Sequence, residues 1–153
     1  MRRLLERIGV IVFFLAWPAF LIYLKRSERT RIIIANGNKV LVTHNWISDG
    51  TWSLPGGGLH KKEPIIQGAQ RELYEETGIR VEQAQLRYLG RQTYRKYGHS
   101  FVFHTFIARD VDSSSVRLQK HEISRTAWLT PAELTDQNTA QDALKALDLW
   151  LHP

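Results

Sequence analysis

The chain has 153 residues, of which 43% are hydrophobic and 24% are charged, a composition typical of one globular domain with its own core. It contains no cysteine, which excludes disulfides, thiolate metal sites and catalysis by a thiol. Residues 1–31 carry seven Lys or Arg against two Glu, so most of the net charge of +6 belongs to the N-terminal end. The rest of the chain is nearly neutral, which disfavours extended contact with nucleic acid.

The N-terminal segment from Ile8 to Leu24 contains no charged residue. A helix of this length rises about 25 Å, close to the roughly 30 Å thickness of a bilayer core. We therefore expect residues 8–24 to cross a membrane once, within an anchor segment over residues 1–30. A cleavable signal peptide and a buried or interfacial helix are the alternatives.

Short β-rich runs follow the N-terminal segment. Residues 32–35 and 40–43 predict two strands, and Asn36-Gly37-Asn38 between them is typical of a hairpin turn. Residues 52–54 predict a further short strand, which leads into Gly56-Gly57-Gly58. Glycine allows the main chain to approach a ligand closely, so this turn is a candidate binding element.

A helix is predicted after the glycine turn. Pro64 is favoured in the first turn of a helix, and apolar residues recur at helical spacing up to Leu73. We expect this helix to run to about Thr77 and to end at Gly78.

In the second half of the chain, β-rich runs predict further strands. A capping box predicts a short helix, and apolar residues at helical spacing predict a last one. In chain order we expect strands at 86–89 and 101–108, a turn at 110–115, a strand at 126–129, a short helix from Thr130 and a last helix over 139–151.

Three carboxylates lie close together on the first predicted helix. Glu72, Glu75 and Glu76 have the spacing i, i+3 and i+4, so they share one side of a helix. Like charges placed this way repel one another unless a cation lies between them. A hard divalent cation such as Mg²⁺ or Mn²⁺, which prefers oxygen ligands, fits this cluster.

The region from Gly57 to Ile79 resembles the Nudix box, GX5EX7REUXEEXGU with U an aliphatic residue, at all nine specified positions. The resemblance to the Nudix hydrolase family extends over about residues 31–152. It implies an α/β/α sandwich with a mixed sheet. The transmembrane helix expected from the apolar run over residues 8–24 precedes this domain and lies outside the resemblance. We therefore expect a Nudix hydrolase domain over residues 31–153.

The resemblance also implies roles for individual residues. Glu72, Glu75 and Glu76 would bind the metal ions, and the carbonyl of Gly56 would be a further ligand. Mg²⁺ is the expected cofactor, with Mn²⁺ as an alternative.

Arg71 and Glu63 would bond to each other across the loop and helix and orient the carboxylates. The general base would be a glutamate of the box or of a later loop, and Glu122, with His121 beside it, is the late candidate. The sequence does not identify the substrate-binding residues.

Together these features predict a membrane-tethered, Mg²⁺-dependent hydrolase that cleaves the diphosphate linkage between a nucleoside diphosphate and another group X. The alternatives are a non-catalytic nucleotide sensor and a hydrolase of a lipid-linked diphosphate. A nucleic acid partner is not expected, except an RNA 5′ end. We expect the catalytic domain to face the cytoplasm, where Mg²⁺ and phosphorylated metabolites are plentiful, although cations flank both ends of residues 8–24 and do not orient the segment.

Overall fold

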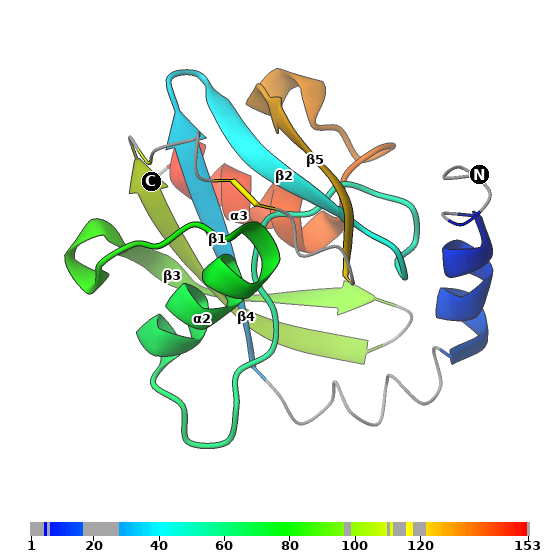
Figure 1. Cartoon of the computed structure of the whole chain (residues 1–153), viewed down its shortest axis with the longest axis horizontal. Coiled ribbons are helices and arrows are strands. Elements are labelled where there is room, and N and C mark those ends of the chain that lie inside the picture. The colour runs from blue at the N-terminus through cyan, green and yellow to red at the C-terminus, as the bar shows by residue number, and fades with distance from the viewer. Residues whose placement is uncertain are drawn as a thin grey trace.

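The computed structural model describes residues 5, 7–16, 28–96, 99–109, 111, 116–117 and 122–152. The strands are β1 (Arg29–Asn36), β2 (Lys39–Asn45), β3 (Arg87–Lys96), β4 (His99–Arg109) and β5 (Ile123–Leu129). They form a mixed sheet in the order β3-β4-β1-β2-β5, as Figure 1 shows. Strand β1 runs parallel to β4, and the other neighbouring pairs are antiparallel.

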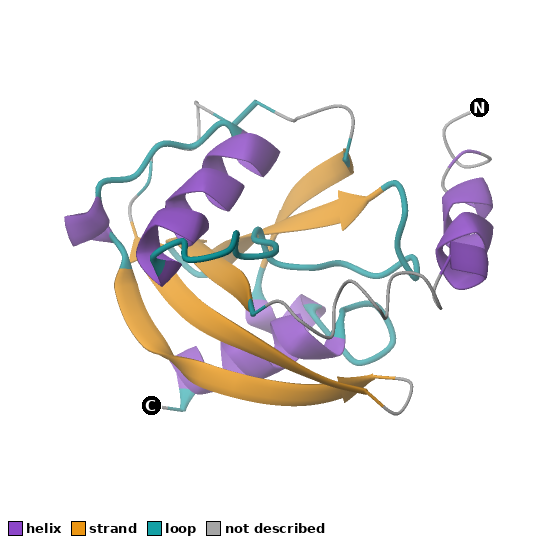
Figure 2. Cartoon of the chain, turned by 90° about the horizontal axis from the view of Figure 1, so that it is seen from below, coloured by secondary structure: helices purple, strands orange, loops and turns teal. Residues whose placement is uncertain are grey.

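Two helices cover the sheet, one on each face (Figure 2). They are α2 (Ile65–Thr77) and α3 (Gln141–Leu151), accompanied by the 3-10 turns η1 (Gln83–Gln85) and η3 (Pro131–Glu133).

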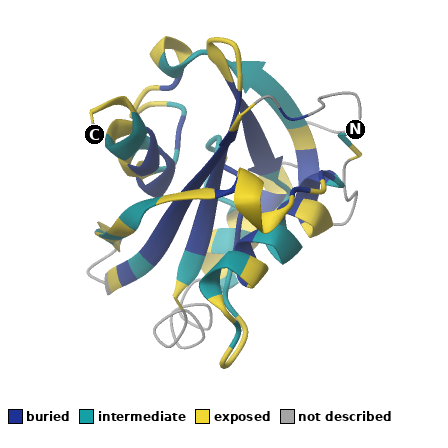
Figure 3. Cartoon of the chain, turned by 90° about the vertical axis from the view of Figure 1, so that its left-hand side faces the viewer, coloured by how far each residue is buried: buried dark blue, intermediate teal, exposed yellow. Residues whose placement is uncertain are grey.

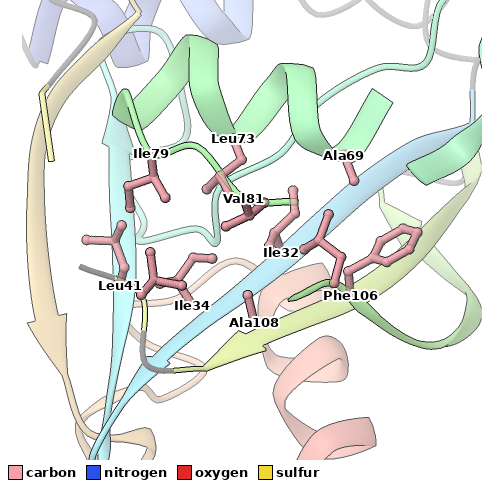
Figure 4. Close-up of a cluster of buried hydrophobic side chains, with 11 residues drawn as sticks. Ile32, Ile34, Leu41, Ala69, Leu73, Ile79, Val81, Phe106 and Ala108 are labelled. Atoms are coloured by element: carbon pink, nitrogen blue, oxygen red, sulfur yellow. The ribbon is translucent and has the colours of Figure 1, made fainter. Parts of the chain in front are cut away.

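The side chains of β1 alternate between two apolar layers, because successive residues of a strand point to opposite faces. Ile32 and Ile34 pack in the cluster that contains Leu73 of α2 (Figure 4). Ile33 packs in the cluster on the other face, which contains Leu147 of α3. The central strands are therefore the most deeply buried part of the molecule (Figure 3). The expected α/β/α sandwich with a mixed sheet is confirmed.

Helix α2 ends where the sequence predicts. Gly78 adopts φ 72°, and its N–H donates a hydrogen bond of 2.8 Å to the carbonyl of Tyr74. Glycine is favoured at this left-handed position because it has no Cβ. The start differs by one residue: Pro64 is still extended, with ψ 134°, and the helix begins at Ile65.

Several predicted boundaries were wrong. Strand β3 extends to Lys96 although its second half is polar, because it pairs with β4 along its length. In the strand expected over 52–54, Trp52 and Ser53 form isolated bridges to Thr139 and Thr43, and these residues form no strand of their own. The capping box at Thr130 is confirmed, but it opens a 3-10 turn. In the turn expected over 110–115, only residue 111 belongs to the described residues.

A short helix covers residues 7–16 at the N-terminal end and is blue in Figure 1. Among the described residues, no helix has the length and apolar character that a membrane crossing requires. The expected transmembrane helix over residues 8–24 is therefore not confirmed. Residues 17–24 of that prediction lie outside the described part of the chain.

Candidate active site

The glycine turn lies against the first residues of β1. The backbone N–H of Thr30 donates to the carbonyl of Gly57 at 2.8 Å, and that of Ile32 donates to Pro55 at 2.8 Å. Gly56 has φ 131°, and a Cβ placed there would lie 2.4 Å from the carbonyl oxygen of Thr30. Only glycine fits this close approach, so β1 fixes the position of the turn.

Two glutamates of α2 contact this turn. The backbone N–H of Gly56 donates to Oε2 of Glu76 at 2.9 Å. The carboxylate of Glu72 lies over Gly57, where a Cβ would come within 2.4 Å of its Oε2. The structure therefore brings together the glycine turn and two of the three clustered glutamates.

Burial makes the negative charge of both glutamates unfavourable. Glu76 is 5% exposed, and desolvation raises its pKa to about 8, although the Gly56 N–H and the charge of Arg31 oppose the shift. Desolvation also raises the pKa of Glu72, opposed by its contact with Arg71. A divalent cation placed between the two carboxylates would relieve this cost and lower both pKa values.

Arg71 holds the carboxylates in place. It forms a forked pair with Glu63, at 2.8 Å from Nε and 2.9 Å from a terminal nitrogen. It also donates to Glu72 at 2.7 Å and to Glu75 at 3.0 Å. The contact between Arg71 and Glu63 that the sequence predicts is present, and together with a bond from the His60 backbone it lowers the pKa of Glu63 to about 2.

The predicted ligand set is assembled only in part. The side chain of Glu75 is 47% exposed and turns toward Arg71. Among the described residues, no group of three or more His, Asp and Glu side chains is arranged to hold a metal ion. The carbonyl of Gly56 accepts a hydrogen bond of 2.7 Å from Arg31. A carbonyl oxygen has two lone pairs, so the second one can still bind a cation. Glu72, Glu76 and this carbonyl are the oxygen donors that fit a hard divalent cation.

A buried ion pair supports the same turn, and sequence reasoning missed it. Arg31 donates from Nε to Asp142 at 2.7 Å, as well as to the carbonyl of Gly56. Asp142, in the first turn of α3, is 4% exposed. Arg31 therefore connects the helix on one face of the sheet to the glycine turn. The signal in the sequence was the charged residue beside the apolar run that begins at Ile32.

Arg29 was also missed. It lies two residues before Arg31 on β1 and lines the cavity described below. Within the part of the chain that the structure describes, its guanidinium group has no hydrogen bond or ion pair. Desolvation and the charge of Arg31 lower its pKa. An anion bound beside Arg29 would offset both effects.

These groups line one cavity of about 460 Å³. The residues that line it include the charged side chains of Arg29, Arg31, Arg71, Glu72, Glu75, Glu76, Glu122 and Asp142 and the aromatic side chains of Phe13, Tyr94 and Phe101. Glu122, directly before β5, is thus brought to the site, and its charge contributes to the raised pKa of Glu76. His121 lies outside the described residues.

In this mixed sheet between two helices, acidic residues of α2 and the side chain of Arg29 line one cavity beside a glycine turn. Residues 25–150 match the family model of the NUDIX domain. The chain belongs to the Nudix family, whose members are hydrolases acting on phosphorus-containing acid anhydrides.

Two relatives and one solved structure illustrate the similarity. The chain is 37% identical over 100 residues to a MutT-like protein of Streptomyces ambofaciens, a match that covers 65% of this chain and 61% of the relative. It is 32% identical over 139 residues to the uncharacterized Nudix hydrolase YfcD of Escherichia coli K12, covering 82% and 72% of the two chains. The crystal structure of a MutT NUDIX hydrolase from Burkholderia pseudomallei shares the fold, with a TM-score of 0.70, 20% identity, and coverage of 80% of this chain and 96% of that one.

Proposed function

We propose that this protein is a pyrophosphohydrolase that depends on Mg²⁺ or Mn²⁺ and cleaves the diphosphate linkage of a nucleoside diphosphate derivative. The observation that carries the proposal is the pair of partly desolvated carboxylates, Glu72 and Glu76, that contact one glycine turn in a cavity also lined by Arg29. No ion pair of Arg29 is present within the described residues. A cavity lined by both carboxylates and guanidinium groups suits a cation and a phosphate group bound next to each other.

Glu72, Glu76 and the carbonyl of Gly56 would hold the cation, which when bound neutralises charge on the diphosphate oxygens and acidifies a water molecule. Arg71 fixes the orientation of Glu72 through their bond of 2.7 Å. Arg31 donates a hydrogen bond to the carbonyl of Gly56, and Asp142 holds Arg31 in position. These contacts set the geometry of the donors before the substrate binds.

Arg29 would donate hydrogen bonds to a non-bridging oxygen of the diphosphate. Glu122 would accept the proton of the attacking water, whose oxygen forms the new bond to phosphorus while the bond to the bridging oxygen breaks. The leaving phosphate carries the bridging oxygen away. Tyr94 and Phe101, whose ring centroids are 5.3 Å apart, offer apolar surface to the nucleobase or to group X.

A substrate panel tests the proposal. Full-length protein would be incubated with dinucleoside polyphosphates, nucleotide sugars, oxidised nucleotides, nucleotide-linked alcohols and capped RNA, with MgCl2 or with EDTA, and the products identified by mass spectrometry. We expect at least one compound to be split at its diphosphate linkage only when the cation is present.

The matched variants are Glu72→Gln, in the site, and Asp136→Asn, on an exposed loop residue. Glu72→Gln should reduce turnover by at least about 100-fold, and Asp136→Asn should leave it unchanged. Cleavage of no compound with either Mg²⁺ or Mn²⁺, or full turnover in Glu72→Gln, would overturn the proposal.

The cytoplasmic position of the catalytic domain is a further part of the proposal, supported by the chemistry of the substrates. A reporter enzyme that is active only in the cytoplasm, fused after residue 153, tests it. If the fusion is active only with a second reporter, one that works only after export from the cytoplasm, the catalytic domain lies outside the cytoplasm and this part of the proposal is wrong.

A further inference from the structure

The N-terminal helix over residues 7–16 lies against the loop that follows β2. Gly9 is buried in this contact, and a Cβ placed there would lie 1.7 Å from the carbonyl oxygen of Trp46. A Cβ at Gly50 would lie 3.6 Å from the side chain of Val10. Glycine inside a helix lowers the stability of the helix, so its presence at the point of contact is explained by the close approach of the two backbones.

The inner side of this helix reaches the active site. Phe13 lies one turn after Gly9 on the same side of the helix, is half-buried, and lines the cavity together with Ile47 and Asp49 of the neighbouring loop. The helix therefore forms part of the wall of the cavity that contains Glu72 and Glu76.

The outer side of the same helix is apolar and exposed. Its exposed large apolar side chains are Leu5, Ile8, Ile11, Val12, Phe14 and Leu15. The most exposed is Leu15, at 77%, and Ile47 on the adjoining loop is 49% exposed. Several large apolar side chains exposed on one side of a helix indicate an interaction surface.

The basic residues of the N-terminal segment indicate which partner this surface binds. The sequence places Arg2, Arg3 and Arg7 at one end of the apolar segment and Lys25 and Arg26 at the other. An apolar segment with basic residues before and after it in the sequence matches the surface of a bilayer containing anionic lipids, where apolar groups enter the acyl region and cations meet the headgroups.

We propose that the helix over residues 7–16 lies along the surface of an anionic lipid bilayer, with Gly9 docked on the domain and the opposite apolar face in the lipid. The mouth of the active site is thereby held at the membrane. The buried contact between Gly9 and Trp46 requires the helix to stay at the surface of the domain, which a helix crossing the bilayer from residue 8 does not do. The proposal goes beyond the proposed hydrolase activity, which needs no membrane.

The depth of residue 15 in the bilayer tests the proposal. Because the chain has no cysteine, Leu15→Cys can be labelled with a single fluorophore in the full-length protein. The labelled protein is mixed with vesicles of dioleoylphosphatidylcholine and dioleoylphosphatidylglycerol that carry spin labels near the headgroup or near the end of the acyl chain. We expect stronger quenching by the label near the headgroup.

A helix that crosses the bilayer over residues 8–24 would place residue 15 near the bilayer centre, so stronger quenching by the label near the chain end would overturn the proposal. Quenching by neither label would also overturn it. The matched control is Asp136→Cys in the folded domain, which should show no quenching by either label.

A second pair of variants separates this inference from the proposed function. The double variant Ile11→Asp and Leu15→Asp places charge on the outer face, and it should weaken binding to the vesicles by at least about tenfold in co-sedimentation while hydrolysis of a soluble substrate is unchanged. Unchanged vesicle binding in this variant would refute the claim that the outer face of the helix binds the bilayer, whatever the result for hydrolysis.

Discussion

Glu76→Gln should stabilise the metal-free protein at high pH and abolish its activity. The native pKa of Glu76 is about 8, against 4.5 for an exposed glutamate, because the fold buries the carboxylate. The native state therefore binds the proton more tightly than the unfolded state. Its contribution to stability is fully present below about pH 4.5 and is lost as the pH rises through 8.

The magnitude follows from the difference between these pKa values. At about 1.4 kcal/mol for each tenfold change in proton affinity, the contribution of Glu76 amounts to roughly 5 kcal/mol. This is an upper limit, because local relaxation and water penetration reduce the cost of a buried charge. Glutamine keeps an oxygen that can accept the Gly56 N–H but carries no charge, so it removes the pH dependence without removing the hydrogen bond.

Urea unfolding of the full-length protein in EDTA, below pH 6 and above pH 8, measures the effect. We expect the free energy of unfolding of the wild type to fall by several kcal/mol across this range, and that of Glu76→Gln to fall much less. Asp136→Asn is the surface control and should follow the wild type. Equal pH dependence in Glu76→Gln and the wild type would refute the assignment of a costly buried charge to this residue.

Three further substitutions probe other parts of the site. Asp142→Ala leaves Arg31 buried without its partner and should cost about 3–5 kcal/mol in thermal unfolding; an unchanged Tm would contradict this. Gly78→Ala forces a left-handed conformation and brings a Cβ to 3.1 Å from Arg117, so it should cost about 1–2 kcal/mol while turnover per folded molecule stays the same. Arg29→Gln should raise KM about tenfold or more with little loss of thermal stability; an unchanged KM would remove Arg29 from substrate binding.

The sequence predicted much of the fold and the acidic part of the site, because both depend on local patterns. The short apolar run over residues 32–35, followed by the turn signal Asn36-Gly37-Asn38, is sufficient to predict a buried strand. The fixed spacing of the Nudix box identifies the glutamates and the end of the helix. The contact of Arg71 with Glu63 follows from the same motif.

The hydrogen bonds by which Arg31 and Asp142 hold the glycine turn could not be predicted from local patterns. Arg31 and Asp142 are 111 positions apart, and no local pattern indicates that they meet. The length of β3 was underestimated because its second half is polar, and pairing with β4 outweighs that composition. The docking of Gly9 on Trp46 depends on the folded position of a loop that the apolar N-terminal segment does not reveal.

Calorimetric titration of Mn²⁺ and Mg²⁺ into EDTA-treated, full-length protein tests the central claim most directly, in the wild type and in Glu72→Gln. We expect the wild type to bind at least one divalent ion, and Glu72→Gln to bind it at least about tenfold more weakly. Folded wild-type protein that takes up neither ion, with or without a nucleotide substrate, would contradict the assignment of this cavity as a metal-assisted diphosphate site.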